Sequence, residues 1–92
     1  MFESPVVSVH IPPALRSYAG GHDEIIASGD TVGELLDSLG HEYPEIRSRL
    51  ISAEGSLMPG LAFYLGGSSL RELQGLATPI GQEEVLSIVA TA

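Results

Sequence analysis

Apolar and polar residues alternate in two short stretches near the start of the chain. In "PVVSVHIPP", every second residue from Val7 to Ile11 is apolar, which is the period of a strand with one buried face. The stretch "EIIA", which begins at Glu24, predicts a second short strand. Between them, Gly20 and Gly21 can adopt the left-handed dihedrals of a turn at little cost. The two stretches together predict an antiparallel hairpin.

The clearest helix signal lies in "DTVGELLDSLG". Thr31 suits the N-cap, and Glu34 three residues later suits its capping-box partner. Gly40 stands where a glycine commonly ends a helix. The apolar residues recur at helical spacing, namely Val32, Leu35, Leu36 and Leu39. Because one face is apolar, this helix is expected to pack on a sheet.

The second half of the chain predicts the rest of the sheet. Pro44 restarts the chain for one more helical turn that places Ile46 and Leu50 on one side. "LAFYL" predicts a third strand, "GGSS" a turn, "LREL" (70–73) a short edge strand and "VLSIVA" the last strand. This order predicts an α+β fold, with a mixed sheet of four to five strands on one main helix. The ubiquitin-like β-grasp satisfies it, with the first and last strands side by side, and residues 1–92 are expected to form a single domain.

A docking surface is predicted on the side of the sheet away from the helix. If Phe63 faces the helix, Tyr64 points to the open side, and the matching phase of the last strand puts Leu86 and Ile88 beside it. An exposed apolar patch of that kind marks a partner-binding site. A six-residue apolar run cannot specify its own face, so the opposite phase stays open. In that phase the outward residues are Val85, Ser87 and Val89.

Composition narrows the possible partners. Four arginines and no lysine stand against twelve carboxylates, for a net charge of -8, which repels a phosphate backbone and argues against nucleic acid. The acidic pair Glu83 and Glu84 is expected to meet a basic rim on a protein partner. The chain has no cysteine and shows neither a secretory pattern nor an apolar run of membrane-spanning length. These features predict a cytoplasmic protein without a membrane partner.

No cluster of residues predicts an active site. The three histidines, His10, His22 and His41, are scattered without the i, i+4 spacing of a helical metal site. No serine lies in a G-x-S-x-G elbow, and the glycine pairs lack the lysine and the following helix of a phosphate-binding loop. We therefore expect neither a metal nor a bound cofactor, and a binding function rather than an enzyme.

Several motifs in series resemble the ubiquitin-like sulfur carriers of the MoaD/ThiS type, and within them the subgroup that supplies sulfur for cysteine biosynthesis. "VSVHIPPALRSYAGG" is similar to the opening strand and the following "IPxxLRxYxGG" segment of that subgroup. "ASGDTVGELLDSL", "YPEIRSRL" and "GLATPIGQEEVLSIV" are similar to its helix start, the stretch after the helix and the run into the last strand. The resemblance covers nearly the whole chain and implies the β-grasp fold.

The resemblance also implies a carrier mechanism centred on the C-terminal tail, residues Ala90, Thr91 and Ala92. In such carriers an E1-like partner enzyme adenylylates the terminal carboxylate with ATP, and sulfur then displaces AMP to leave a thiocarboxylate. A sulfur-accepting synthase uses that product for cysteine, molybdopterin, thiamine or a related compound. The carrier is a substrate and binds no cofactor itself.

The tail departs from the family pattern, whose members end in Gly-Gly. Aligning Glu84 and Val85 with the start of the family's last strand places Ala92 just before the two glycines, and a second register leaves the tail three residues short. A chain that ends at Ala92 is therefore expected to be a poor adenylylation substrate. Three explanations stay open: the glycines were removed, the tail is completed otherwise, or the domain is a non-transferring binding module that docks on or regulates a partner enzyme.

Overall fold

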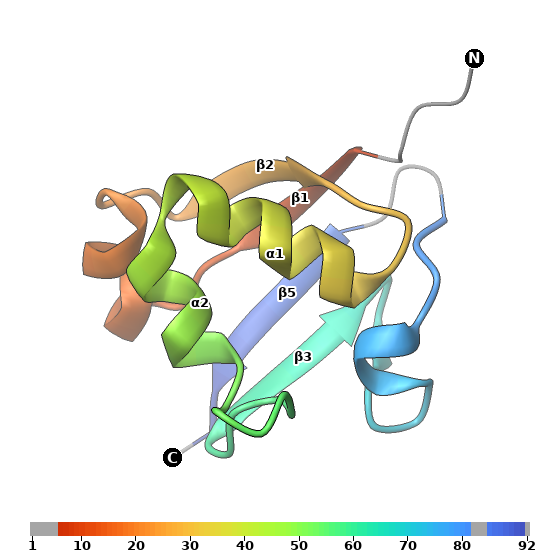
Figure 1. Cartoon of the computed structure of the whole chain (residues 1–92). Coiled ribbons are helices and arrows are strands. Elements are labelled where there is room, and N and C mark those ends of the chain that lie inside the picture. The colour runs from red at the N-terminus through yellow and green to blue at the C-terminus, as the bar shows by residue number, and fades with distance from the viewer. Residues whose placement is uncertain (1–5, 82–84, 92) are drawn as a thin grey trace.

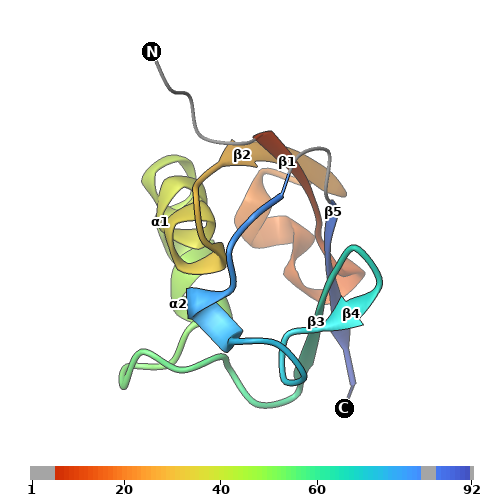
Figure 2. The same ribbon diagram turned by 90° about the vertical axis from the view of Figure 1, so that its right-hand side faces the viewer.

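The chain folds into a sheet with helices on one of its faces. The computed structural model describes residues 6–81 and 85–91, and the helices cover one side of a sheet whose strand order is β2-β1-β5-β3-β4 (Figure 1; Figure 2). The strands are β1 (Val6–His10), β2 (Glu24–Ser28), β3 (Leu61–Leu65), β4 (Ser68–Ser69) and β5 (Val85–Ala90). The helices are α1 (Val32–Glu42), α2 (Pro44–Leu50) and the short 3-10 elements η1 (Pro13–Ala19) and η2 (Gly75–Ala77). The predicted α+β fold is confirmed.

The first and last strands lie side by side in the middle of the sheet, as expected for a β-grasp. β1 pairs antiparallel with β2 and parallel with β5, while β5 pairs antiparallel with β3. Gly20 and Gly21 have φ angles of 66° and 82°, so the predicted turn between β1 and β2 is confirmed at both glycines. The connection also contains η1, which the alternating pattern did not predict.

The start of α1 follows the predicted cap. The Thr31 side chain accepts a hydrogen bond from the backbone N–H of Glu34 at 3.2 Å. The Glu34 carboxylate accepts the backbone N–H of Asp30 at 3.3 Å, one residue before the position that a standard capping box uses. The first bond satisfies an N–H group that the helix start would otherwise leave without a partner, and the second ties the Glu34 side chain to the residue before the cap.

Gly40 does not end the helix, and that prediction is wrong. α1 continues through Gly40 to Glu42, and Pro44 begins α2 almost at once. A Cβ atom at Gly40 would lie 2.9 Å from Cδ and 3.0 Å from Cβ of Arg47. Glycine at this position therefore allows the two helices to approach closely. In the sequence, a glycine required for packing looks the same as a glycine that ends a helix.

The edge strand also lies elsewhere than predicted. β4 consists of Ser68 and Ser69, and the predicted strand at 70–73 is a turn. The pair Gly66–Gly67 forms a two-residue hairpin loop, with Leu65 opposite Ser68, so pairing resumes immediately after the glycines. Leu70 then turns into the core, where its carbonyl accepts the N–H groups of Leu73 and Gly75.

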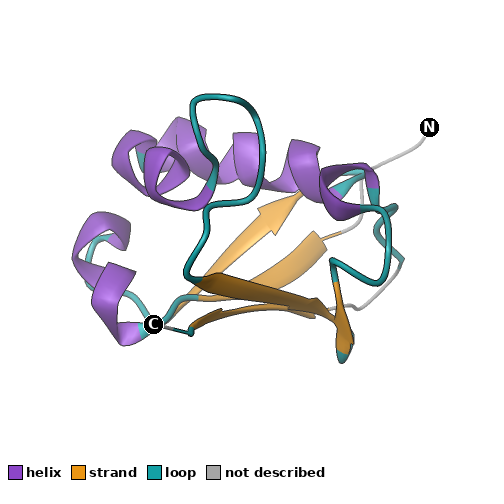
Figure 3. Ribbon diagram, turned by 90° about the horizontal axis from the view of Figure 1, so that it is seen from below, coloured by secondary structure: helices purple, strands orange, loops and turns teal. Residues whose placement is uncertain are grey.

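The core lies between the sheet and the two α-helices. α1 contributes its predicted apolar face, and Ile46 and Leu50 of α2 are fully buried as predicted. Figure 3 shows both helices on the same side of the strands. None of the helices in residues 6–81 and 85–91 lies on the other side of the sheet, which leaves that side available for contact with a partner.

Candidate docking face and carboxyl-terminal strand

The sheet surface without helices, called here the open face, carries most of the large exposed apolar side chains. Its residues come from alternate positions of β1, β2, β3 and β5, because neighbours across a sheet share a face. Ser8 lies opposite both Ile26 and Val85, and Tyr64 lies opposite Ser87. The exposed apolar members of this face are Val6, Ile26, Tyr64, Val85 and Val89.

The orientation predicted for the last strand is wrong. Leu86 and Ile88 have exposed fractions of 0% and 3%, so they belong to the core and not to the docking surface. Leu86 lies opposite Val9 on one side and Leu65 on the other, and Ile88 lies opposite Phe63. All of these partners point toward the helices, and register forces Leu86 and Ile88 to do the same. The opposite phase, which the apolar run left open, is the observed one.

Tyr64 does point to the open side, with 38% of its surface exposed, and its role in binding a partner stays a prediction. The alternation in "LAFYL" was sufficient to orient it, since Phe63 and Leu65 are buried. Glu83 and Glu84 lie outside the described residues, so the proposed acidic contact stays untested. Ala92 also lies outside the described residues.

The sequence pattern did not predict Val6 and Ile26 on this face, and it placed Val85 and Val89 there only in the alternative phase of the last strand. Val6 could have been predicted from the sequence, because successive side chains in a strand point to opposite faces and Val7 was expected to point inward. The phase of Val85 and Val89 would have followed from the parallel pairing of the last strand with the first. That pairing brings together residues almost eighty positions apart, and no local pattern contains it.

A polar row divides the apolar residues of the open face. The imidazole Nε2 of His10 lies 3.3 Å from the Glu24 carboxylate, which also accepts a hydrogen bond from the Ser8 hydroxyl. The row continues across the sheet, because His10 lies opposite Ser87 and Ser87 opposite Tyr64. Such a row gives the face hydrogen-bonding positions that can orient a partner.

The end of β5 is held firmly to the sheet. Ala90 pairs with Leu61, and the Thr91 N–H donates to the carbonyl of Gly60 at 2.9 Å. Both Ala90 and Thr91 are exposed. Ala90 and Thr91, which were expected to belong to the tail, are therefore held to the sheet by main-chain pairing, and a segment that reaches away from the sheet can begin only beyond Thr91.

Metal-ligating clusters and membrane-spanning helices are both absent from the part of the chain that the structure describes. Among residues 6–81 and 85–91, no group of three or more histidine, cysteine, aspartate or glutamate side chains is arranged to hold a metal ion. Within the same ranges, no helix has the length and apolar character needed to cross a bilayer.

Comparison with known proteins gives a consistent set of relatives. A model described as the ThiS family matches residues 9–92. The sulfur carrier protein CysO of Mycobacterium bovis is 35% identical over 85 residues, which cover 90% of this chain and 91% of that protein. The sulfur carrier protein CysO of Mycobacterium tuberculosis H37Rv matches with the same identity and coverage.

Solved structures agree with these relatives. The crystal structure of Mycobacterium tuberculosis CysO, described as an antigen, matches with a TM-score of 0.88 at 34% identity, over 94% of this chain and 99% of that chain. A chain of the Amycolatopsis orientalis BexX/CysO complex matches with a TM-score of 0.87 at 29% identity, over 94% and 96%. The small archaeal modifier protein 1 of Methanosarcina acetivorans shares the fold, with a TM-score of 0.80 at 24% identity, over 97% and 95%.

Proposed function

The chain belongs to the ThiS family and is a homologue of the CysO sulfur carriers, and we propose that it carries sulfur as a thiocarboxylate at the end of the segment after β5. The observation that supports this proposal is the position of β5. It lies between β1 and β3 in the sheet, and the bond from Thr91 to Gly60 holds its end. A segment that follows β5 would therefore start from a strand end that is fixed within the sheet, which is the support that a carrier tail requires.

In this proposal the chemistry belongs to a partner of the E1-like adenylyltransferase class, which binds the ATP. A carboxylate oxygen of the tail attacks the α-phosphorus of ATP, and pyrophosphate leaves. A hydrosulfide equivalent then attacks the acyl carbon, and AMP leaves with the electron pair of the broken C–O bond. The resulting thiocarboxylate passes to a sulfur-accepting synthase, and the resemblance to the subgroup that supplies sulfur for cysteine biosynthesis favours a synthase of that pathway.

The open face is the proposed contact with that partner. A CysO chain has been crystallised in complex with BexX. Protein–protein interfaces commonly combine apolar contacts with hydrogen bonds, and the open face offers apolar side chains and a polar row. Val89 is the last but one residue of β5, and Tyr64 lies on the same face opposite Ser87. Docking there would bring the tail to the partner's nucleotide.

The test compares a chain that ends at Ala92 with the same chain extended by Gly-Gly. Each is incubated with a CysO-activating enzyme, ATP and a sulfide source, and then weighed intact. Two glycines add about 7 Å of reach beyond the sheet without side chains that would hinder entry to a narrow channel. We expect the extended chain to gain the mass of an oxygen-to-sulfur exchange and the shorter chain to gain little.

Two other results would change the conclusion. If neither chain gains sulfur while both still bind the enzyme, the non-transferring binding module is the correct function. If the chain ending at Ala92 reacts as fast as the extended one, the expectation for its tail is wrong and the carrier function stands. A Val89→Asp version of the extended chain serves as the docking control, and it should react more slowly at equal enzyme concentration.

A further inference from the structure

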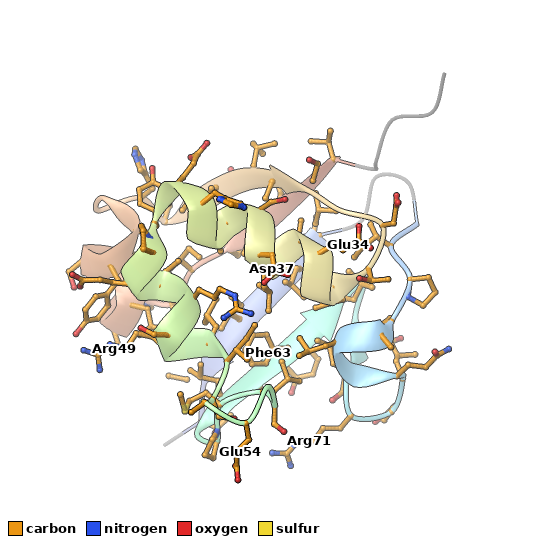
Figure 4. All side chains as sticks on the ribbon, in the orientation of Figure 1. Glu34, Asp37, Arg49, Glu54, Phe63 and Arg71 are labelled. Atoms are coloured by element: carbon orange, nitrogen blue, oxygen red, sulfur yellow. The ribbon has the colours of Figure 1, made fainter. Side chains whose placement is uncertain are left out.

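A groove of about 890 Å³ opens beside the outer edge of β3. The loop 52–60 forms one wall through Leu57 and Met58, and the segment 69–77 forms the other through Leu70 and Leu76. Phe63 lies on its floor (Figure 4). Its volume is within the range of about 300–1,000 Å³ that ligand-binding clefts occupy.

The hydrogen-bond pattern of β3 shows which main-chain groups face this groove. In an antiparallel pair, alternate residues direct both their N–H and C=O groups to the same neighbour. The N–H of Gly66 donates to Val85 at 3.1 Å, and the N–H of Thr91 donates to Gly60 at 2.9 Å. The even-numbered residues of this stretch therefore bond to β5. The odd-numbered residues direct their polar groups to the outer edge.

That edge is only partly covered. β4 pairs with Tyr64 and Leu65 alone, and the Phe63 carbonyl accepts the Leu70 N–H at 2.9 Å. Beyond this point the chain turns away. For the N–H and C=O of Leu61 and the N–H of Phe63, the described chain provides no main-chain partner. These three groups have the spacing that an added strand would match.

Arg71 supplies a charge at the mouth of the groove, where its side chain extends toward the loop that carries Glu54 (Figure 4). The described residues contain one arginine–carboxylate ion pair and one histidine–carboxylate contact, and neither includes Arg71. The other arginines each have a partner: Arg16 donates to the Ile11 carbonyl, Arg47 to Asp37, and Arg49 lies over the Tyr18 ring. Among the described residues Arg71 has no hydrogen bond, ion pair or ring contact through its guanidinium, and it is the arginine that lines the groove, so its guanidinium is available there for a carboxylate.

We propose that this groove binds an extended segment of a partner protein by strand addition to β3, with one carboxylate of the segment held by Arg71. Strand addition takes its affinity from main-chain bonds and its specificity from side-chain pockets, and the groove offers both. Glu72 also lines the groove, so the segment should be otherwise uncharged. Tyr64 and Thr91 line it as well, which makes the groove continuous with the open face and the end of β5.

The test titrates the isotope-labelled 92-residue chain with the peptide acetyl-VTVTV, which has a free carboxylate, and with its C-terminal amide. The main-chain N–H resonances of Leu61 and Phe63 should shift on binding, and hydrogen exchange at Phe63 should slow. The free carboxylate should bind about threefold more tightly than the amide, which is the effect of a partly exposed ion pair. Alternating valine and threonine present one apolar face in either register.

Matched variants distinguish a specific contact with Arg71 from the general effect of removing one positive charge. Arg71→Gln should remove the preference for the free carboxylate, Arg49→Gln should keep it, and Glu72→Gln should strengthen binding of the carboxylate form. The absence of saturable shifts would overturn the proposal, because strand addition tolerates many sequences. Resonance shifts centred on β2 or on the residues around Val85 would also overturn it. So would a preference for the free carboxylate over the amide that persists in Arg71→Gln.

Discussion

The two faces of β5 differ in environment although both are apolar. Leu86 and Ile88 lie under the helices, whereas Val85 and Val89 are exposed on the open face. All four are branched aliphatic residues in one run of six, so side-chain hydrophobicity does not separate them. The pairing with β1 and β3 decides which of them are buried, because residues opposite each other in a sheet point to the same face and the residues opposite Leu86 and Ile88 point to the core. A central strand takes its orientation from its neighbours.

The sharpest way to test this comparison is to place the same charge on adjacent residues. Ile88→Asp should lower the free energy of unfolding by about 3 kcal/mol or more, because it buries a charge without a partner. Val89→Asp should change it by about 0.5 kcal/mol or less and should instead weaken docking of a partner. Urea unfolding measures the first effect. Equal losses of stability from the two variants would show that the two faces are not distinct.

A second variant tests how closely α1 and α2 pack against each other. Alanine at Gly40 would gain about 1 kcal/mol from helix propensity alone, but its Cβ would meet Arg47 at 2.9 Å to Cδ. Overpacking of that kind costs about 1–3 kcal/mol, so we expect a net loss of about 1 kcal/mol by thermal or urea unfolding.

The same substitution in an Arg47→Ala background removes the contact with Cδ and should cost less. A stabilising Gly40→Ala in the original chain would mean that α2 moves away at no cost. The close approach of the two helices would then not explain the glycine.

The smallest effect is expected on the open face. Glu24→Gln removes the charge that faces His10 at 3.3 Å, where both side chains are about half exposed. Exposed ion pairs contribute about 0–1 kcal/mol, so the loss should be about 0.5 kcal/mol or less. A double-mutant cycle with His10→Gln measures the coupling directly. Coupling well above 1 kcal/mol would show that the open face contributes to stability more than its exposure indicates.

Local patterns predicted most of the elements, and their failures have physical causes. The alternation in β1, the cap at Thr31 and the turn at Gly20 all depend on neighbours within a few residues, and all are confirmed. Gly40 was misread because a glycine that permits helix packing looks the same as one that ends a helix. The edge strand was placed too late because the loop geometry at Gly66 and Gly67, and not the residues after it, decides where pairing resumes.

By itself the sequence determined the order of the elements, the carrier family and the outward position of Tyr64, since each is encoded in short-range spacing or in motifs in series. Tertiary structure alone decided which side of β5 is buried, how α2 packs on α1 and which main-chain groups of β3 have no main-chain partner within the described residues. These properties depend on the parallel pairing of β5 with β1 and on where β4 leaves the sheet. The final strand "VLSIVA" is apolar on both sides, and its neighbours determine which side a partner can reach.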